Sequence, residues 1–462
     1  MDDLAKKDKL EMESVPRLIA TLAIPAIIAQ MINVFYNIID RIFISRIAHV
    51  GDMALAGVGV CFPILILISA FAQLIGPSGA TLASIQLGKG NRKLAEEILG
   101  SGYMCLILIS ITLTAVFQIT KVPVLMAFGA SPATIQYADQ YLSVYLWGTV
   151  FVQTTLGLYP FLTCQGKSKI AMIAVLIGAV LNLLLDPIFI FVLGLGVRGA
   201  AIATVISQAT SAGWLLRYLL SEKSSILLRG KNLQLKQDVL TPIVALGIST
   251  FIMSFTECLI NVVFNRGLLK YGGDYYVAAM TIIQSIMQLI YIFSNGLTQG
   301  VQPVISFNYG ARRFDRVKMA YRIGFAAHIT ISVCMSSLIM LLPEFFASFF
   351  TSNQEIIHIV ARMMPVFVCG WGIFGIQSGA QCAFVSLGQA KISLFLACLR
   401  KVILLIPLAL ILPGFIGVIG IFIAEPISDV ISAITAGLLF GLNIKSILEK
   451  EGKVCTKIGS TM

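Results

Sequence analysis

Charged residues are scarce in this sequence: only 12% of its 462 residues are Asp, Glu, Lys or Arg, whereas 58% are hydrophobic. This composition excludes an ordinary soluble domain, because such a domain needs far more polar surface to cover its core. Short segments with alternating polar and apolar side chains, typical of a transmembrane barrel, are also missing. Long apolar runs fill the chain instead. We therefore predict an all-α polytopic membrane protein.

Motifs for catalysis and for nucleic-acid binding are absent as well. The nine cysteines form no C-x-x-C pair and no pattern with histidine, so we interpret them as packing residues. The glycine-rich stretch 76–90 lacks the strand-to-helix context and the GK[ST] ending of a phosphate loop. The net charge of +11 is spread over short loops and does not collect in one basic domain. These absences predict a protein that is not an enzyme, needs no cofactor or structural metal, and binds no nucleic acid.

Twelve apolar segments, separated by polar residues or by Gly and Pro, predict twelve transmembrane helices. Several of them exceed the length that a span requires, which leaves room for tilt or kinks. The segments are 17–46, 53–87, 95–119, 134–164, 170–195, 199–220, 240–268, 276–308, 317–350, 357–386, 392–413 and 417–444.

The distribution of Lys and Arg predicts the orientation of the chain. Most of the 33 basic residues lie in the two tails and in the loops that follow even-numbered spans. Since basic loops stay on the cytoplasmic side, we expect both termini in the cytoplasm. We expect the membrane to be the plasma (inner) membrane. The expected tails are 1–16 and 445–462, and the first has no apolar core that would mark a cleaved signal peptide.

An internal repeat divides the chain into two halves. Three separate stretches recur about 220 residues further along the chain, which is unlikely by chance. Since each half has an even number of spans, both halves enter the membrane from the same side. We predict an N-lobe at 17–220, a cytoplasmic linker at 221–239 and a C-lobe at 240–444, which is the organisation of an alternating-access transporter. The paired stretches are 76–90 with 296–310, 166–169 with 388–391, and 196–199 with 417–420.

Asp40 is the first functional candidate, because it lies within an apolar span. An acid inside a membrane helix costs about 2.5–3.5 kcal/mol on insertion scales and is therefore a functional candidate by default. The alternative is that Asp40 only pairs with the adjacent Arg41.

Asp186 is the second candidate, and it shares a helix face with Asn182 four residues earlier. The following Pro187 withholds a backbone donor and frees the carbonyl of Leu183. Carboxylate and amide oxygens can hold a proton or a small hard cation such as Na⁺. The alternative is that Asp186 caps a helix or a bend near the outer surface.

The second half lacks both of these acids but holds other buried ionisable residues. Glu257 in the seventh span is either a hydrogen-bonded interior acid or a contact for substrate or ion. Arg400 and Lys401 in the eleventh span either snorkel to the cytoplasmic interface or pair with acids. Glu425 and Asp429, four residues apart in the last span, are their candidate partners.

His328 stands alone on an apolar helix. We expect it to be an interior histidine whose ring nitrogens are both hydrogen-bonded.

These features resemble the multidrug and toxic compound extrusion (MATE) family of secondary transporters, in the branch with an acidic residue in the first helix. The resemblance extends from about Pro16 to Asn443 and implies twelve helices in two pseudo-symmetric six-helix lobes around a central cavity. It also implies a multidrug efflux antiporter that exports amphipathic, often cationic compounds in exchange for inward H⁺ or Na⁺, and so contributes to antibiotic resistance. The segments that carry it are FYNIIDRIFIS around Asp40, the twin segments ending in KGNRK and NYGARR, QGKSK, and LRKVILLIPL.

The resemblance also implies roles for particular residues. Other branches carry an acid in the tenth span, and 357–386 has none, which argues against a cation site in the C-lobe. The implied substrate contacts are Glu257 and Asp40. The implied coupling-cation site comprises Tyr36, Asp40, Asn182, Asp186 and Thr204, of which the last four would be the ligands of a Na⁺ ion.

Two other functions fit part of the pattern. One is a flippase for lipid-linked oligosaccharides or cell-wall precursors, which usually has a more cationic cavity. The other is a non-transporting scaffold, which would have no use for buried acids. We expect a monomer in the lipid bilayer, with small-molecule drugs and organic cations as its partners.

Overall fold

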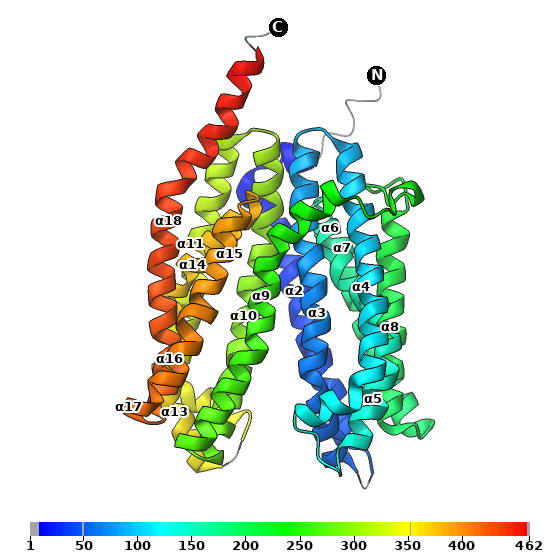
Figure 1. Cartoon of the computed structure of the whole chain (residues 1–462), viewed down its shortest axis with the longest axis vertical. Coiled ribbons are helices and arrows are strands. Elements are labelled where there is room, and N and C mark those ends of the chain that lie inside the picture. Colours follow the sequence, from blue (N-terminus) through cyan, green and yellow to red (C-terminus); the bar gives the residue numbers. More distant parts are fainter. Residues whose placement is uncertain (1–8, 49, 352, 460–462) are drawn as a thin grey trace. The chain divides into compact units, whose positions relative to one another are not determined.

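The computed structural model describes residues 9–48, 50–351 and 353–459, and within these ranges the regular elements are all helices (Figure 1). Apolar segments form helices in a bilayer because lipid offers no partner to a free backbone N–H or C=O group. The elements of the first half are α1 (Lys9–Met12), α2 (Val15–Ser45), α3 (Gly51–Gly88), α4 (Arg92–Ala127), α5 (Ile135–Trp147), α6 (Thr149–Thr163), α7 (Ser168–Pro187), the π-helix η1 (Ile188–Val192), α8 (Gly196–Leu219) and the 3-10 helix η2 (Gly230–Asn232). Those of the second half are α9 (Gln237–Tyr271), α10 (Asp274–Gly310), α11 (Phe314–Leu341), α12 (Pro343–Ser348), α13 (Gln354–Val368), α14 (Trp371–Ser386), α15 (Ala390–Cys398), the π-helix η3 (Leu399–Leu405), α16 (Ile406–Ile411), α17 (Pro413–Ile416) and α18 (Ile419–Gly459).

Ten spans in the described part of the chain are long and apolar enough to cross a membrane, and the bent pair α13 and α14 makes an eleventh if it is one span. That pair bends by 46°. The remaining predicted segment, 134–164, is covered by α5 and α6, which meet at Gly148 and are each short for a bilayer. The last helix, α18, continues to Gly459 instead of ending at 444, because Lys, Glu, Leu and Ile favour a helix there.

Internal contacts divide the chain into two compact units. The N-unit is Ile24–Phe251, and the C-unit joins the chain up to Ala23 to the chain from Ile252 onward. The boundaries therefore lie inside α2 and α9, whose first parts pack with the opposite half of the sequence. The lobe limits that the repeat suggests stay a prediction.

Glycines allow the close contacts that these two helices make. In the N-unit, a Cβ atom on Gly247 of α9 would lie 1.7 Å from the carbonyl oxygen of Leu74. In the C-unit, a Cβ atom on Gly300 of α10 would lie 2.5 Å from the Cβ of Ala23 in α2. The absence of a side chain lets the backbones approach to distances that larger residues exclude.

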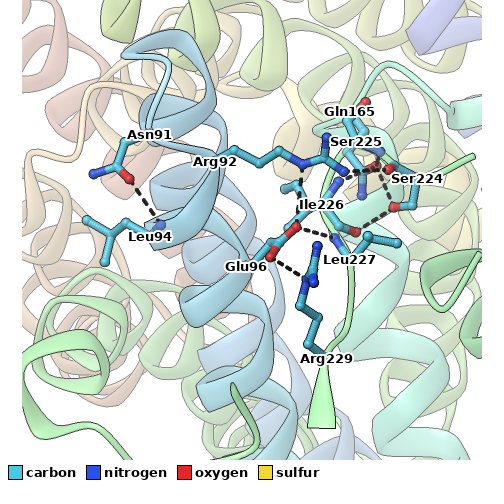
Figure 2. Close-up of polar contacts among 10 residues, drawn as sticks. All are labelled: Asn91, Arg92, Leu94, Glu96, Gln165, Ser224, Ser225, Ile226, Leu227 and Arg229. Atoms are coloured by element: carbon cyan, nitrogen blue, oxygen red, sulfur yellow. Dashed lines mark hydrogen bonds and ion pairs between the residues drawn. The ribbon is translucent and has the colours of Figure 1, made fainter. Parts of the chain in front are cut away.

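The predicted linker is docked on the N-unit by two buried side chains (Figure 2). Glu96 of α4 pairs with the guanidinium of Arg229 at 3.0 Å. The Oε1 atom of Gln165 accepts hydrogen bonds from the backbone N–H groups of Ser225 at 2.8 Å and Ile226 at 3.3 Å. These contacts hold the segment before α9 against the N-unit, which explains why the start of α9 belongs to that unit.

The repeat is visible in the turn after α3 and in its counterpart after α10. Gly90 and Arg312 have left-handed φ angles of 77° and 58°, and each donates its N–H to the carbonyl three residues earlier. The sequence alignment pairs Gly90 with Gly310, but the turn geometry pairs it with Arg312, two residues later. The sequence comparison matched Gly90 with another glycine, Gly310. In the second turn, however, the residue with the left-handed φ angle is an arginine, Arg312. Gly166 and Gly388, also left-handed at 76° and 69°, keep the predicted pairing.

Candidate cation site

Three helices of the N-unit carry the five predicted cation-site residues. Tyr36 and Asp40 lie one turn apart on α2, Asn182 and Asp186 one turn apart on α7, and Thr204 on α8. Asp186 is fully buried, and Asp40, Asn182 and Thr204 are at most 9% exposed. Burial of two acids is costly unless they find protons, cations or hydrogen-bond donors.

The carboxyl groups of Asp40 and Asp186 lie within hydrogen-bonding reach of each other. The Nδ2 group of Asn182 donates to Oδ1 of Asp186 at 3.1 Å. Within the described structure, Oδ1 of Asp40 and Oδ2 of Asp186 are buried and have no hydrogen-bond partner. Two ionised carboxylates cannot donate to each other, so this approach needs a proton or another cation between them.

Arg41 does not pair with Asp40 in the described part of the chain. Its guanidinium lies over the ring of Phe62, with 4.2 Å to the ring centroid. This contact is a cation–π interaction, and the charge of Arg41 still attracts Asp40 without a direct ion pair. A direct ion pair of Asp40 with Arg41, the alternative considered from the sequence, is therefore not formed among the described residues, and only a longer-range attraction joins the two.

Three further polar residues adjoin the site. Tyr141 and Tyr145 of α5 are buried and stack on each other with 5.9 Å between ring centroids. Tyr141 is electrostatically close to Asp40, and Gln208 of α8 lies within hydrogen-bonding reach of Tyr36. Sequence reasoning missed them, although each lies four residues from another polar residue on the same helix face.

The arrangement offers oxygen atoms rather than nitrogen or sulfur ligands. In the described ranges no three His, Cys, Asp or Glu side chains come together as a metal site. The available side-chain oxygens are those of two carboxylates, a tyrosine, a threonine and two carboxamides. One of them, Oε1 of Gln208, is buried without a partner in the described structure. Such a set suits a proton between the acids or a small hard cation such as Na⁺.

In the C-unit, the two basic residues of the eleventh span are paired with acids. Arg400 contacts Asp429 through Nε at 2.7 Å and Glu425 through Nη2 at 2.8 Å. Lys401 pairs with Glu257 of α9. The predicted pairing with Glu425 and Asp429 is thus confirmed for Arg400, and the snorkelling alternative is wrong because the Arg400 side chain is only 3% exposed.

Glu257 lies in the C-unit, whereas the other predicted site residues lie in the N-unit. Its side chain is 52% exposed even with Lys401 as a partner. It is therefore not the fully buried acid of the first alternative, and its role as a substrate contact stays a prediction.

His328 has the environment that we expected. Its ring nitrogens lie 3.0 Å from the hydroxyl of Thr298 and 2.8 Å from the carbonyl oxygen of Gly324. The prediction of a hydrogen-bonded interior histidine is confirmed.

Comparisons with known proteins agree with this architecture. The family model described as MatE matches the chain twice, at residues 25–188 and 249–411. The multidrug export protein MepA of Staphylococcus haemolyticus is 25% identical over 432 residues, which cover 92% of this chain and 93% of MepA. A structure described as the outward-facing conformation of a multidrug resistance MATE family transporter has a TM-score of 0.89 and 23% identity, with coverage of 96% of this chain and 99% of that chain. A structure named protein A is 33% identical with a TM-score of 0.88, and covers 95% of this chain and 98% of its own. These likenesses confirm the predicted fold class, an all-α membrane protein with twelve transmembrane helices in two lobes.

Proposed function

Because the chain belongs to the MATE family, whose members are membrane transporters and not enzymes, we propose that it is a multidrug efflux antiporter. It exports amphipathic, often cationic compounds in exchange for inward H⁺ or Na⁺. The description of MepA as a multidrug export protein supports this substrate class. In this proposal the transporter is a monomer in the plasma (inner) membrane with both termini in the cytoplasm.

One observation carries the coupling part of the proposal. Asp40 and Asp186 approach each other in the interior of the N-unit, and each keeps a carboxylate oxygen that is unpartnered within the described structure. A site with uncompensated negative charge binds a cation and releases it when the surroundings change. Asp40, Asp186, Asn182, Thr204 and Tyr36 would form the coupling site.

The proposed cycle links this site to movement of the first span. Cation entry from outside neutralises the two acids, and α2 bends near Pro25, the proline inside that helix. Only a ligand that favours one conformation over the other can shift the equilibrium, so cation and cargo must prefer different states. Asp40 and Glu257 are the proposed contacts for cationic cargo.

Transport into proteoliposomes with separately imposed pH and Na⁺ gradients tests the proposal. We expect dye accumulation against its gradient when one of the two ion gradients is present. Asp40→Asn should lose most of this gradient-driven transport, at least about tenfold, because the amide cannot take up the cation. Asp238→Asn, at an exposed acid in the first turn of α9, is the matched control and should transport normally.

Full gradient-driven transport by Asp40→Asn would remove this residue from the mechanism. If neither ion gradient drives dye uptake and the protein instead moves a lipid-linked precursor, the drug-export function is refuted.

A further inference from the structure

The C-unit contains a cluster of five charged residues that the coupling site does not use. It joins Arg400 and Lys401 of η3 to Glu425 and Asp429 of α18 and to Glu257 of α9. The cluster has three acids and only two bases, so one negative charge is left over. Since each base already holds at least one acid, the excess charge is shared by Glu425 and Asp429 around Arg400.

The excess negative charge is least compensated at one atom, Oδ2 of Asp429. The Asp429 side chain is fully buried, and its Oδ1 accepts a hydrogen bond from Nε of Arg400 at 2.7 Å. Its Oδ2 is also buried and has no hydrogen-bond partner among the described residues. Glu425 is partly exposed at 12%, so its carboxylate retains some contact with the surroundings. A charged buried carboxylate oxygen without a partner is costly, and a bound proton would remove its charge.

Aromatic side chains cover the Arg400 end of this cluster. The guanidinium of Arg400 lies over the Phe374 ring at 4.2 Å, and Trp371 stacks beside that ring with 5.8 Å between centroids. Tyr291 of α10 packs edge-on against Trp371 at 5.5 Å. A wall of this kind keeps water away and strengthens the electrostatic penalty on an unbalanced charge.

Other ionisable groups also face Asp429 from the helices around it. Tyr291 on α10 and Cys369 between α13 and α14 are both within its electrostatic reach, as is Lys401. The phenol and the thiol carry no positive charge, and the charge of Lys401 is shared with Glu257, so the cluster keeps one excess negative charge.

We propose that Asp429 holds a proton in the C-unit, at a second proton-binding site formed with Glu425 and Arg400. A proton fits better than a metal cation, because Na⁺ and Ca²⁺ require several oxygen ligands and the site presents one free buried oxygen on Asp429. The site goes beyond the proposed coupling at Asp40 and Asp186, and it stands even if those two acids do not couple transport.

Glu257 influences the net charge around Asp429 through its ion pair with Lys401. Its half-exposed carboxylate forms the ion pair with Lys401, so the positive charge of Lys401 is shared between Glu257 and the two buried acids. If Glu257 loses its charge, the cluster has two acids and two bases, and the proton on Asp429 is no longer needed. The cluster thereby connects an exposed acid to a buried proton.

Infrared spectroscopy of the purified full-length protein tests the proposal directly. The parent protein carries Asp40→Asn and Asp186→Asn, so that the two acids of the proposed coupling site contribute nothing. At about pH 7 exposed carboxyl groups are ionised, and a C=O band from a protonated carboxyl group reports a buried acid. We expect such a band in the parent and its loss when Asp429→Asn is added. Asp315→Asn, at an exposed acid in the first turn of α11, is the matched control and should keep the band.

Two more variants make the test independent of folding problems at Asp429. Glu257→Gln changes a half-exposed side chain and should also abolish the band, because Lys401 then balances the acids. Lys401→Met should instead increase the band, because it removes a base. A parent without the band, or a band that persists in both Asp429→Asn and Glu257→Gln, would overturn the proposal. Loss of the band on addition of Na⁺ to the parent would also overturn it, because the site would then bind Na⁺ instead of a proton. Since the readout is spectroscopic and both coupling-site acids are replaced, failure here is separate from failure of the antiport experiment.

Discussion

Gln165 provides a sharp test of how the linker is attached to the N-unit. Its Oε1 accepts hydrogen bonds from the Ser224 hydroxyl and from the backbone N–H groups of Ser225 and Ile226, at 2.9, 2.8 and 3.3 Å. Its Nε2 donates to the carbonyl of Phe161 at 2.8 Å. The substitution Gln165→Leu keeps a similar volume but removes every one of these bonds.

The expected cost follows from the donors that lose their acceptor. The Ser224 hydroxyl keeps a second acceptor, the carbonyl of Ile226, so the loss falls on two backbone N–H groups. A buried donor without a partner costs about 1–3 kcal/mol, and Ser225 is only partly buried, which places the total at about 3 kcal/mol. Since about 1.4 kcal/mol is a factor of ten, the detached linker should become roughly a hundredfold more populated.

Hydrogen–deuterium exchange of the linker peptide measures this change. We expect the amides of Ser225 and Ile226 to exchange roughly a hundredfold faster in Gln165→Leu than in the parent protein. Gln234→Leu, the same substitution at an exposed position of the linker, should leave their exchange unchanged. Equal protection in Gln165→Leu and Gln234→Leu would refute the claim that this side chain fixes the linker.

Two further substitutions probe packing and charge. Gly247→Ala should lower the melting temperature, because its Cβ would lie 1.7 Å from the Leu74 carbonyl oxygen and overpacking costs about 1–3 kcal/mol. The control Gly213→Ala places its Cβ in open space and should leave the melting temperature unchanged. A Gly247→Ala protein as stable as Gly213→Ala would contradict the close approach of α9 and α3. Arg400→Met should destabilise the protein by about 3–5 kcal/mol in thermal unfolding, because its buried acids lose their partner, and Arg400→Met combined with Asp429→Leu should recover part of the loss. No recovery in the double variant would show that Arg400 stabilises the C-unit mainly through other contacts.

Several features could be predicted from the amino-acid sequence. The length of the apolar segments predicted the helical membrane fold, since a bilayer allows an isolated segment few alternatives to a helix. The internal repeat was detectable, and the MatE model does match the chain once in each half. The register of the repeat was wrong at one turn. The sequence comparison paired Gly90 with Gly310, whereas the turn geometry pairs it with Arg312.

The sequence alone could not predict which residues pair with the buried charges. Both pairing and snorkelling were open for Arg400 and Lys401, and only the packed structure selected Asp429, 29 residues away, and Glu257, 144 residues away.

The sequence by itself determined that costly acids lie within apolar spans, because hydropathy is a local property of consecutive residues. Only the tertiary structure decided that Asp40 meets Asp186 while Arg41 turns to Phe62. The reason is physical: Coulomb energy and hydrogen bonding depend on distance and direction in space, and these are set by how helices pack, not by separation along the chain.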